Sequence, residues 1–162
     1  DKRYSDERSW DFDTTAQGWR YHMSNIMAAI GLKQLERFQE FKKKRQMLAK
    51  KYDYLFINNS TIKPLPRDYN LVVPHIYVVR IHGMKNREKI KQKMFDKGIQ
   101  VGYHYQPNHW LSYYKVDNAL SFPITEKIFP ELMSLPLHPD LSIDDVEYIS
   151  KQLIDQVGNS NE

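Results

Sequence analysis

One long segment dominates the hydrophobic pattern of this chain. Large apolar side chains recur there at mostly helical spacing, namely Leu32, Leu35, Phe38, Phe41, Leu48, Tyr52 and Leu55. This spacing predicts a single helix from about Met23 to Ile57, with Ser24 at its start. At 1.5 Å per residue such a helix measures about 50 Å, which is too long for a lone compact domain of this size. We therefore expect the helix to bridge two lobes or two subunits.

Shorter elements precede and follow this helix. Alternating and continuous apolar runs predict strands at 9–16, 74–82, 99–105 and 132–137, and helices at 86–97, 122–129 and 142–154. Pro64 and Pro66 indicate a connector. The order of these elements predicts an α/β or α+β fold, in which helices cover a small sheet.

Composition adds few constraints. The 162 residues are 41% hydrophobic and 27% charged, as in an ordinary globular protein, and there is no cysteine for a disulfide or a thiolate metal site. No apolar run approaches the about 20 residues that cross a membrane, and no signal peptide is visible. We expect a cytoplasmic protein without a membrane partner.

The net charge of +4 is mild, and much of the excess lies in Lys42–Arg45 and Lys50–Lys51. These residues fall within the long helical pattern, where a run of charge is usually a solvated face. A nucleic-acid surface is the alternative, but the helix needs Phe38, Phe41 and its other apolar residues for packing. We therefore expect no nucleic-acid partner.

Two clusters carry candidate chemistry. The first follows the strand predicted at 99–105 and contains His104, Tyr105, Asn108 and His109, a polar aromatic group typical of the edge of a binding site. Ordinary structural roles are the alternative for each histidine. No carboxylate lies between His104 and His109 and the HExxH motif is absent, so we expect no metal.

The second cluster, Gly18–Ser24, lies where the long helix begins. A helix N-terminus attracts anions, and the guanidinium of Arg20 adds a full charge, so a phosphate is the natural ligand. An exposed arginine beside an ordinary cap is the alternative. The chain contains no phosphate-binding glycine motif and no nucleophile motif. The residues alone therefore indicate no complete active site.

Three segments resemble one family. They are GWRYHMSNIMAAIGLKQ at 18–34, KGIQVGYHYQPNHWLSYY at 97–114 and FPITEKIFPELMSLPLHPDLSIDDVEYI at 122–149. In that order they resemble the C-terminal portion of the DegT/DnrJ/EryC1/StrS sugar aminotransferases. The resemblance implies the aspartate-aminotransferase (type I) fold and a reaction dependent on pyridoxal 5′-phosphate (PLP). An amino acid, commonly glutamate, would give its amino group to a nucleotide-linked keto sugar.

The resemblance also implies how the chain is divided into parts and which partners it has. Residues 1–22 would be a strand and junction left from a large cofactor domain, 23–58 the bridging helix, and 59–162 the small C-terminal domain. The lysine that binds PLP in the family belongs to a segment with no match here, so the chain is expected to be inactive by itself. Its expected partners are an N-terminal cofactor domain or chain, a second copy in a homodimer, and the sugar nucleotide.

Site residues follow from the matched segments. Arg20 would contact the phosphate of the PLP held by the partner subunit, although the family usually has Asn there and Arg at the position of His22. His104 and Tyr105 would bind the sugar nucleotide, with Asn108 and His109 nearby. No catalytic residue is expected in the chain. A non-catalytic interaction or regulatory module, or part of a PLP-dependent sugar dehydratase, remains an alternative.

Overall fold

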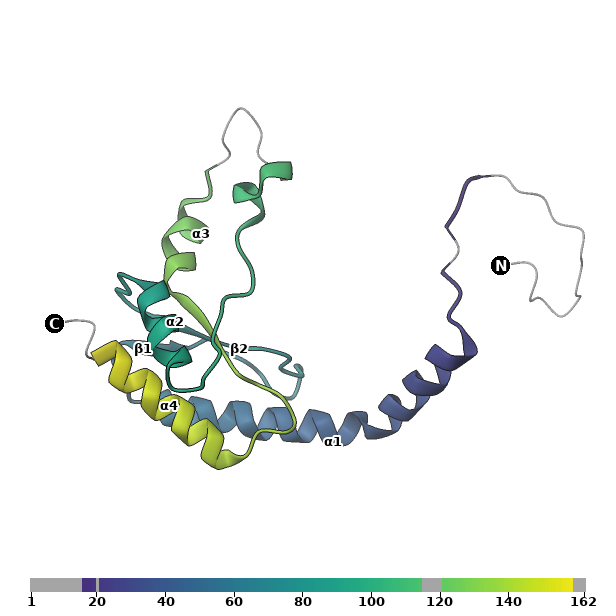
Figure 1. Ribbon diagram of the computed structural model, residues 1–162, viewed down its shortest axis with the longest axis horizontal. Coiled ribbons are helices and arrows are strands. Elements are labelled where there is room, and N and C mark those ends of the chain that lie inside the picture. The colour runs from purple at the N-terminus through teal and green to yellow at the C-terminus, as the bar shows by residue number, and fades with distance from the viewer. Residues whose placement is uncertain (1–15, 20, 115–120, 159–162) are drawn as a thin grey trace, which may run out of the picture. The chain divides into compact units, whose positions relative to one another are not determined.

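The computed structural model describes residues 16–19, 21–114 and 121–158 (Figure 1). The chain divides into two units, 1–36 and 37–162, and the boundary falls inside the first helix. Among the described residues, no helix is both long and apolar enough to cross a membrane. The predicted division into 1–22, 23–58 and 59–162 remains a prediction.

Helix α1 spans Asn25–Phe56 and confirms the long helix predicted from the apolar spacing. Ser24 caps its start, because the Ser24 hydroxyl accepts a hydrogen bond from the Met27 backbone N–H at 3.3 Å. Past its end, the Asn59 side chain accepts hydrogen bonds from the backbone N–H groups of Thr61 and Ile62. This turn leads the chain directly into the sheet.

The sheet has three antiparallel strands in the order β1-β2-β3. They span Ile62–Pro64, Tyr77–Ile81 and Leu132–Leu135. Strands β2 and β3 lie within predicted strands, whereas β1 was read as a connector, which was wrong. Pro64 does not prevent pairing, because it is the last residue of an edge strand, where a missing N–H is tolerated.

Three further helices were predicted correctly: α2 at Arg87–Phe95, α3 at Pro123–Ile128 and α4 at Ile143–Gly158. Asn86 caps α2 through the Lys89 backbone N–H, and Gly98, with φ of 75°, follows its end. Short 3-10 turns occupy Asn108–Trp110, Ser112–Tyr114 and Phe129–Glu131.

The predicted strand 99–105 does not form, and only Gly102 pairs with Ser134 of β3. Continuing this antiparallel register would place Gln100 opposite Pro136. Pro136 has no N–H to donate, and its carbonyl already accepts a hydrogen bond from the Tyr52 hydroxyl at 3.0 Å. The next pair is therefore lost, and the segment leaves the sheet. For the other predicted strand, residues 9–15 lie outside the described residues.

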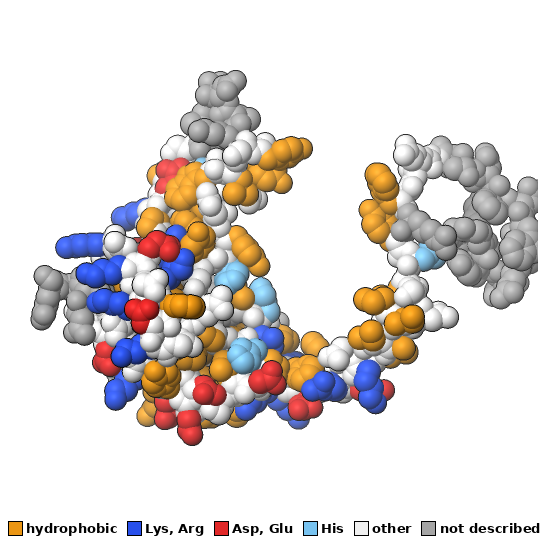
Figure 2. All heavy atoms as spheres, in the orientation of Figure 1, with side chains coloured by type: hydrophobic (Ala, Val, Ile, Leu, Met, Phe, Trp, Pro, Cys, Tyr) orange, Lys and Arg blue, Asp and Glu red, His pale blue; other side chains and the backbone are white. Residues whose placement is uncertain are grey.

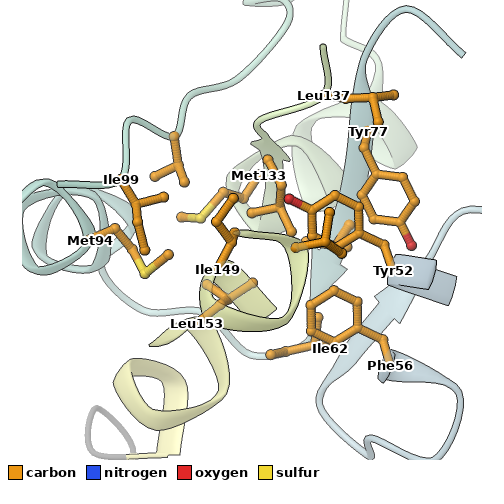
Figure 3. Close-up of a cluster of buried hydrophobic side chains, with 14 of the residues drawn as sticks. Tyr52, Phe56, Ile62, Tyr77, Met94, Ile99, Met133, Leu137, Ile149 and Leu153 are labelled. Atoms are coloured by element: carbon orange, nitrogen blue, oxygen red, sulfur yellow. The ribbon is translucent and has the colours of Figure 1, made fainter. Parts of the chain in front are cut away.

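One hydrophobic core holds the second unit together (Figure 3). The C-terminal half of α1 contributes Tyr52 and Phe56, and Tyr52 stacks on Tyr77 of β2 with ring centroids 4.5 Å apart. Helix α4 closes the core with Ile149 and Leu153, which are almost fully buried. Ile99 and Val101 on one side of β3, and Leu137 beyond its end, belong to the same core, which therefore also anchors the segments that flank this strand.

Candidate functional site

The turn that follows the Gly102 bridge carries the two foremost candidates. His104 is exposed, and 78% of the Tyr105 surface is accessible. Their rings meet edge to face with centroids 5.0 Å apart, across a cis peptide bond. Both side chains are thus adjacent and free to meet a ligand, but their binding role remains a prediction.

Asn108 and His109 lie in the next 3-10 turn and differ in their surroundings. Asn108 is exposed, whereas the His109 side chain is only 14% accessible. His109 Nε2 lies 3.2 Å from Glu126 Oε1 of α3, and the same oxygen accepts a hydrogen bond from the Phe122 backbone N–H. His109 therefore ties the turn to α3, a contact that sequence spacing did not indicate.

A groove of about 710 Å³ lies beside the candidate turn. Segments 98–102 and 134–138 line it together with α4, and so does His104. His75 and His138 also line the groove, and Figure 2 shows several histidine side chains on one face of the second unit. Neither His75 nor His138 was among the predicted site residues, and the sequence places His75 inside the strand predicted at 74–82.

Hydrogen bonds from the core helices fix the walls of this groove. The Arg45 guanidinium donates to the carbonyl oxygens of His75, at 3.0 Å, and Leu137, at 2.8 Å. The Tyr148 hydroxyl of α4 donates to the Lys97 carbonyl at 3.2 Å. Arg45 belongs to the charged run that was expected to be solvated, yet it is partly buried and holds two backbone segments together.

One carboxylate, Asp145, lines the groove. Its oxygen accepts hydrogen bonds from the Ser142 backbone N–H, at 2.8 Å, and from the Ser142 hydroxyl, at 2.7 Å. These two hydrogen bonds lower the pKa of Asp145 below its ordinary value. One oxygen of Asp145 is therefore engaged in capping α4.

A second polar cluster lies away from the groove, around Asp53 of α1. The hydroxyls of Tyr69 and Tyr77 donate to its two oxygens at 2.5 and 2.7 Å. Burial, followed by the hydrogen bond to Asp53, raises the pKa of Tyr77 well above its ordinary value. Arg67 covers the ring of Tyr77, with its guanidinium carbon 4.7 Å from the centroid. The cluster fixes β2 to α1.

The junction before α1 is the segment in which Arg20 was predicted to contact the cofactor. Arg20 lies outside the described residues, and its neighbours Trp19 and Tyr21 are about four-fifths exposed or more. Within the part of the chain that the structure describes, no cluster of three or more His, Asp or Glu side chains could hold a metal ion. The contact of Arg20 with the cofactor phosphate remains a prediction.

The fold itself defines a class. The chain superposes on PseC of Helicobacter pylori, an aminotransferase of pseudoaminic acid biosynthesis, with a TM-score of 0.82 at 23% identity, over 93% of this chain and 42% of PseC. It is thus part of the aminotransferase fold. The model of the DegT/DnrJ/EryC1/StrS aminotransferase family matches residues 1–154, and the chain belongs to this family.

Several relatives have described activities. A Campylobacter jejuni UDP-4-amino-4,6-dideoxy-N-acetyl-beta-L-altrosamine transaminase is 27% identical over 91% of this chain and 40% of its own length. A Saccharopolyspora spinosa dTDP-4-dehydro-2,3,6-trideoxy-D-glucose 4-aminotransferase is 31% identical over 91% of this chain and 37% of its own length. The chain therefore spans about two-fifths of the curated relatives that it matches.

The aminotransferase TlmJ from Streptoalloteichus hindustanus is a solved relative, 28% identical with a TM-score of 0.77 over 93% of this chain and 41% of TlmJ. Spr1654 of Streptococcus pneumoniae has been solved in PLP and PMP forms. It is 29% identical to this chain with a TM-score of 0.83, and its PLP form is matched over 93% of this chain and 40% of its own length. Spr1654 therefore carries the pyridoxal cofactor.

Proposed function

We propose that this chain forms the C-terminal part of a PLP-dependent aminotransferase. Its substrates would be an amino acid, with glutamate the expected donor, and a keto sugar linked to a pyrimidine nucleoside diphosphate. The UDP- and dTDP-linked sugars in the names of two relatives support the nucleotide class. The observation that carries the proposal is the accessible His104–Tyr105 pair, placed beside a large groove in a member of this family.

In this reaction the residues of this chain would bind and orient the substrate, and the cofactor would supply the chemistry. Bound PLP supplies the electron sink that lets an amino group leave the donor amino acid. His104 and Tyr105 would bind and orient the sugar nucleotide through an imidazole and a phenol. Asn108 would add a side-chain amide from the same turn, while His109 would hold this turn to α3 through Glu126.

A cofactor domain is the partner that α1 would require. Apolar side chains in its first three turns are largely exposed, including Ile26 at 75% and Leu35 at 68%. Exposed apolar patches on a helix mark a surface that another polypeptide covers. We propose that a cofactor domain, on the same or another chain, covers this part of α1, and that Arg20 contacts PLP of the second subunit in a homodimer.

Two alternatives give different results in one experiment. A sugar dehydratase would use the same cofactor domain but would remove a hydroxyl group as water and leave no amino group on the sugar. A non-catalytic module would bind its partner without generating the absorbance of bound PLP. The transaminase and aminotransferase activities in the names of two relatives support the aminotransferase over both.

Reconstitution tests the proposal. The chain mixed with PLP alone is expected to leave the spectrum of free PLP unchanged, whereas the chain joined to its cofactor domain should give the bound-cofactor absorbance and convert glutamate to 2-oxoglutarate when a keto-sugar nucleotide is added. His104→Ala should reduce turnover, while His82→Ala, an exposed histidine outside the groove, should not. Absence of both cofactor binding and amino transfer in the joined protein would contradict the proposal.

A further inference from the structure

Arg87, the first residue of α2, joins segments that are far apart in the sequence. Its side chain is partly buried, and its Nη1 donates hydrogen bonds to the carbonyl oxygens of Phe129, at 2.9 Å, and of Leu132, at 3.4 Å. Its guanidinium carbon lies 4.0 Å from the centroid of the Tyr103 ring and 4.5 Å from that of the Phe129 ring. One cation therefore contacts both the segment before the candidate turn and the segment that leads into β3.

Two ring contacts tie both ends of the loop around the candidate turn to Phe129. The rings of Tyr103 and Trp110 each meet the Phe129 ring edge to face, with centroids 5.4 Å apart. Phe129 is buried, and its carbonyl is held by Arg87, so its ring is a fixed support. The exposed His104–Tyr105 pair lies between these two anchors in the sequence. The ring cluster and the cation that covers it therefore determine where the candidate turn stands.

The chemistry of a guanidinium suits this place better than that of an ammonium group. A planar guanidinium can stack on aromatic faces while its edge donates hydrogen bonds, whereas lysine supplies a hydrated point charge. A cation over an aromatic ring gains most where water is excluded, and the Nε atom of Arg87 is buried, without a hydrogen-bond partner among the described residues. The Nζ of Lys91 lies farther out, 5.5 Å from the Tyr103 centroid, and pairs with Glu88 at 2.7 Å. Arg87 is therefore the cation that supports the Tyr103 ring.

We propose that Arg87 is a positioning residue for the aminotransferase reaction. It would act through Tyr103 and Phe129, which set where the candidate turn stands, and not through a contact with the substrate. This inference rests on the proposed function. It assigns a role to α2, which lies outside the three segments that carry the family resemblance.

Backbone order in the candidate turn tests this role without catalysis. In the full chain, Arg87→Met should lower the heteronuclear NOE of the turn amides, because the turn gains fast motion once its support is lost, while the amides of α4 keep their wild-type values. Tyr103→Leu should have the same effect, whereas Tyr103→Phe keeps the ring face and should not. Lys89→Met, at an exposed position of the same helix, is the matched control.

Kinetics of the joined protein separate positioning from a general loss of stability. A misplaced turn weakens ground-state and transition-state binding equally, so Arg87→Met should raise the KM for the sugar nucleotide about fivefold and change kcat by less than about twofold. Partial unfolding would instead reduce the amount of active enzyme and leave KM unchanged. Adding Tyr103→Leu to Arg87→Met should raise KM no further, because both substitutions break the same contact.

Either of two results would overturn the inference: turn amides in Arg87→Met that are as ordered as in the wild type, or a KM for the sugar nucleotide that stays at the wild-type value. Failure of the proposed function looks different, because the joined protein would then transfer no amino group at all. In that case the NOE values decide, and loss of order in both Arg87→Met and Tyr103→Leu would still show that Arg87 positions the turn.

Discussion

Single polar side chains decide much of the stability of the second unit. Asp53 is partly buried and meets two tyrosine hydroxyls, one from β2 and one from the loop before it. Ser150 of α4 shows the opposite situation, since its buried hydroxyl has no hydrogen-bond partner among the described residues. Removing a hydroxyl should therefore have opposite effects at these two places.

Tyr77→Phe should lower the free energy of unfolding by about 2 kcal/mol, because Asp53 loses one of its two hydroxyl donors while remaining partly buried. Urea denaturation measures the loss, and Tyr54→Phe, at a 71% exposed position, is the control. The raised pKa of Tyr77 stabilises the fold below the ordinary tyrosine pKa of about 10, and this stability is lost as the pH rises further. The decline above pH 10 should therefore be shallower in Tyr77→Phe.

Ser150→Ala should raise the free energy of unfolding by about 0.5–1 kcal/mol. Alanine has the higher helix propensity, and the substitution removes a buried hydroxyl that makes no hydrogen bond. Thermal unfolding followed by circular dichroism would reveal the gain. A loss of stability would mean that the hydroxyl has a partner after all.

Among the elements, α4 has the best-defined start. The Ser142 hydroxyl accepts the Asp145 backbone N–H at 3.0 Å, and Asp145 reaches back to the Ser142 N–H. This reciprocal capping box is legible in the sequence as Ser-Ile-Asp-Asp, with aspartate in the place of the more usual glutamate. The remainder of α4 follows from its apolar periodicity.

Ser142→Ala should lower the free energy of unfolding by about 1 kcal/mol at neutral pH. The pKa of Asp145 is lowered by its bonds to Ser142, so their contribution is present above the ordinary aspartate pKa of about 4 and is lost as the pH falls. The difference between the wild type and Ser142→Ala should accordingly shrink below about pH 4. Urea titrations at pH 7 and pH 3 make the comparison, and an equal difference at both would contradict this account.

Local sequence patterns predicted most helices and strands, but they failed where residues distant in the sequence determine whether a strand can pair. The apolar patterns of α1, α2 and β3 are local signals, and each of these elements was predicted correctly. Residues 99–105 have an equally good strand pattern, yet Tyr52 and Pro136 remove the pairing that a strand needs. Likewise, nothing near His75 or His109 in the sequence indicates the groove or the contact with Glu126.

At the scale of the whole molecule, the two halves of α1 face different surroundings. Leu48 and Tyr52 are fully buried in the second unit, whereas Leu32 and Leu35 are about two-thirds exposed. The exposed half contributes little to the core, yet it presents apolar side chains to which another polypeptide can bind. Stability and association should therefore depend on different parts of one helix.

Replacing Leu32 and Leu35 together by Ser should change the free energy of unfolding by less than about 0.5 kcal/mol beyond the small helix-propensity cost. Light scattering after size exclusion should nevertheless show weaker self-association, and binding to a cofactor domain should fall. Lys33→Ser on the same helix is the control. Unchanged association would argue against this face as a contact surface.

The prolines that limit the sheet have a consequence for the life of the chain in a crowded cell. Strand β1 ends at Pro64, and Pro136 directly follows β3. A foreign extended chain that added to β1 would soon meet Pro64, which offers no N–H, and the outer edge of β3 is already paired at Ser134 with Gly102, so stacking into fibrils would stop within a few residues. The short, proline-limited strands therefore protect the sheet against edge-to-edge aggregation.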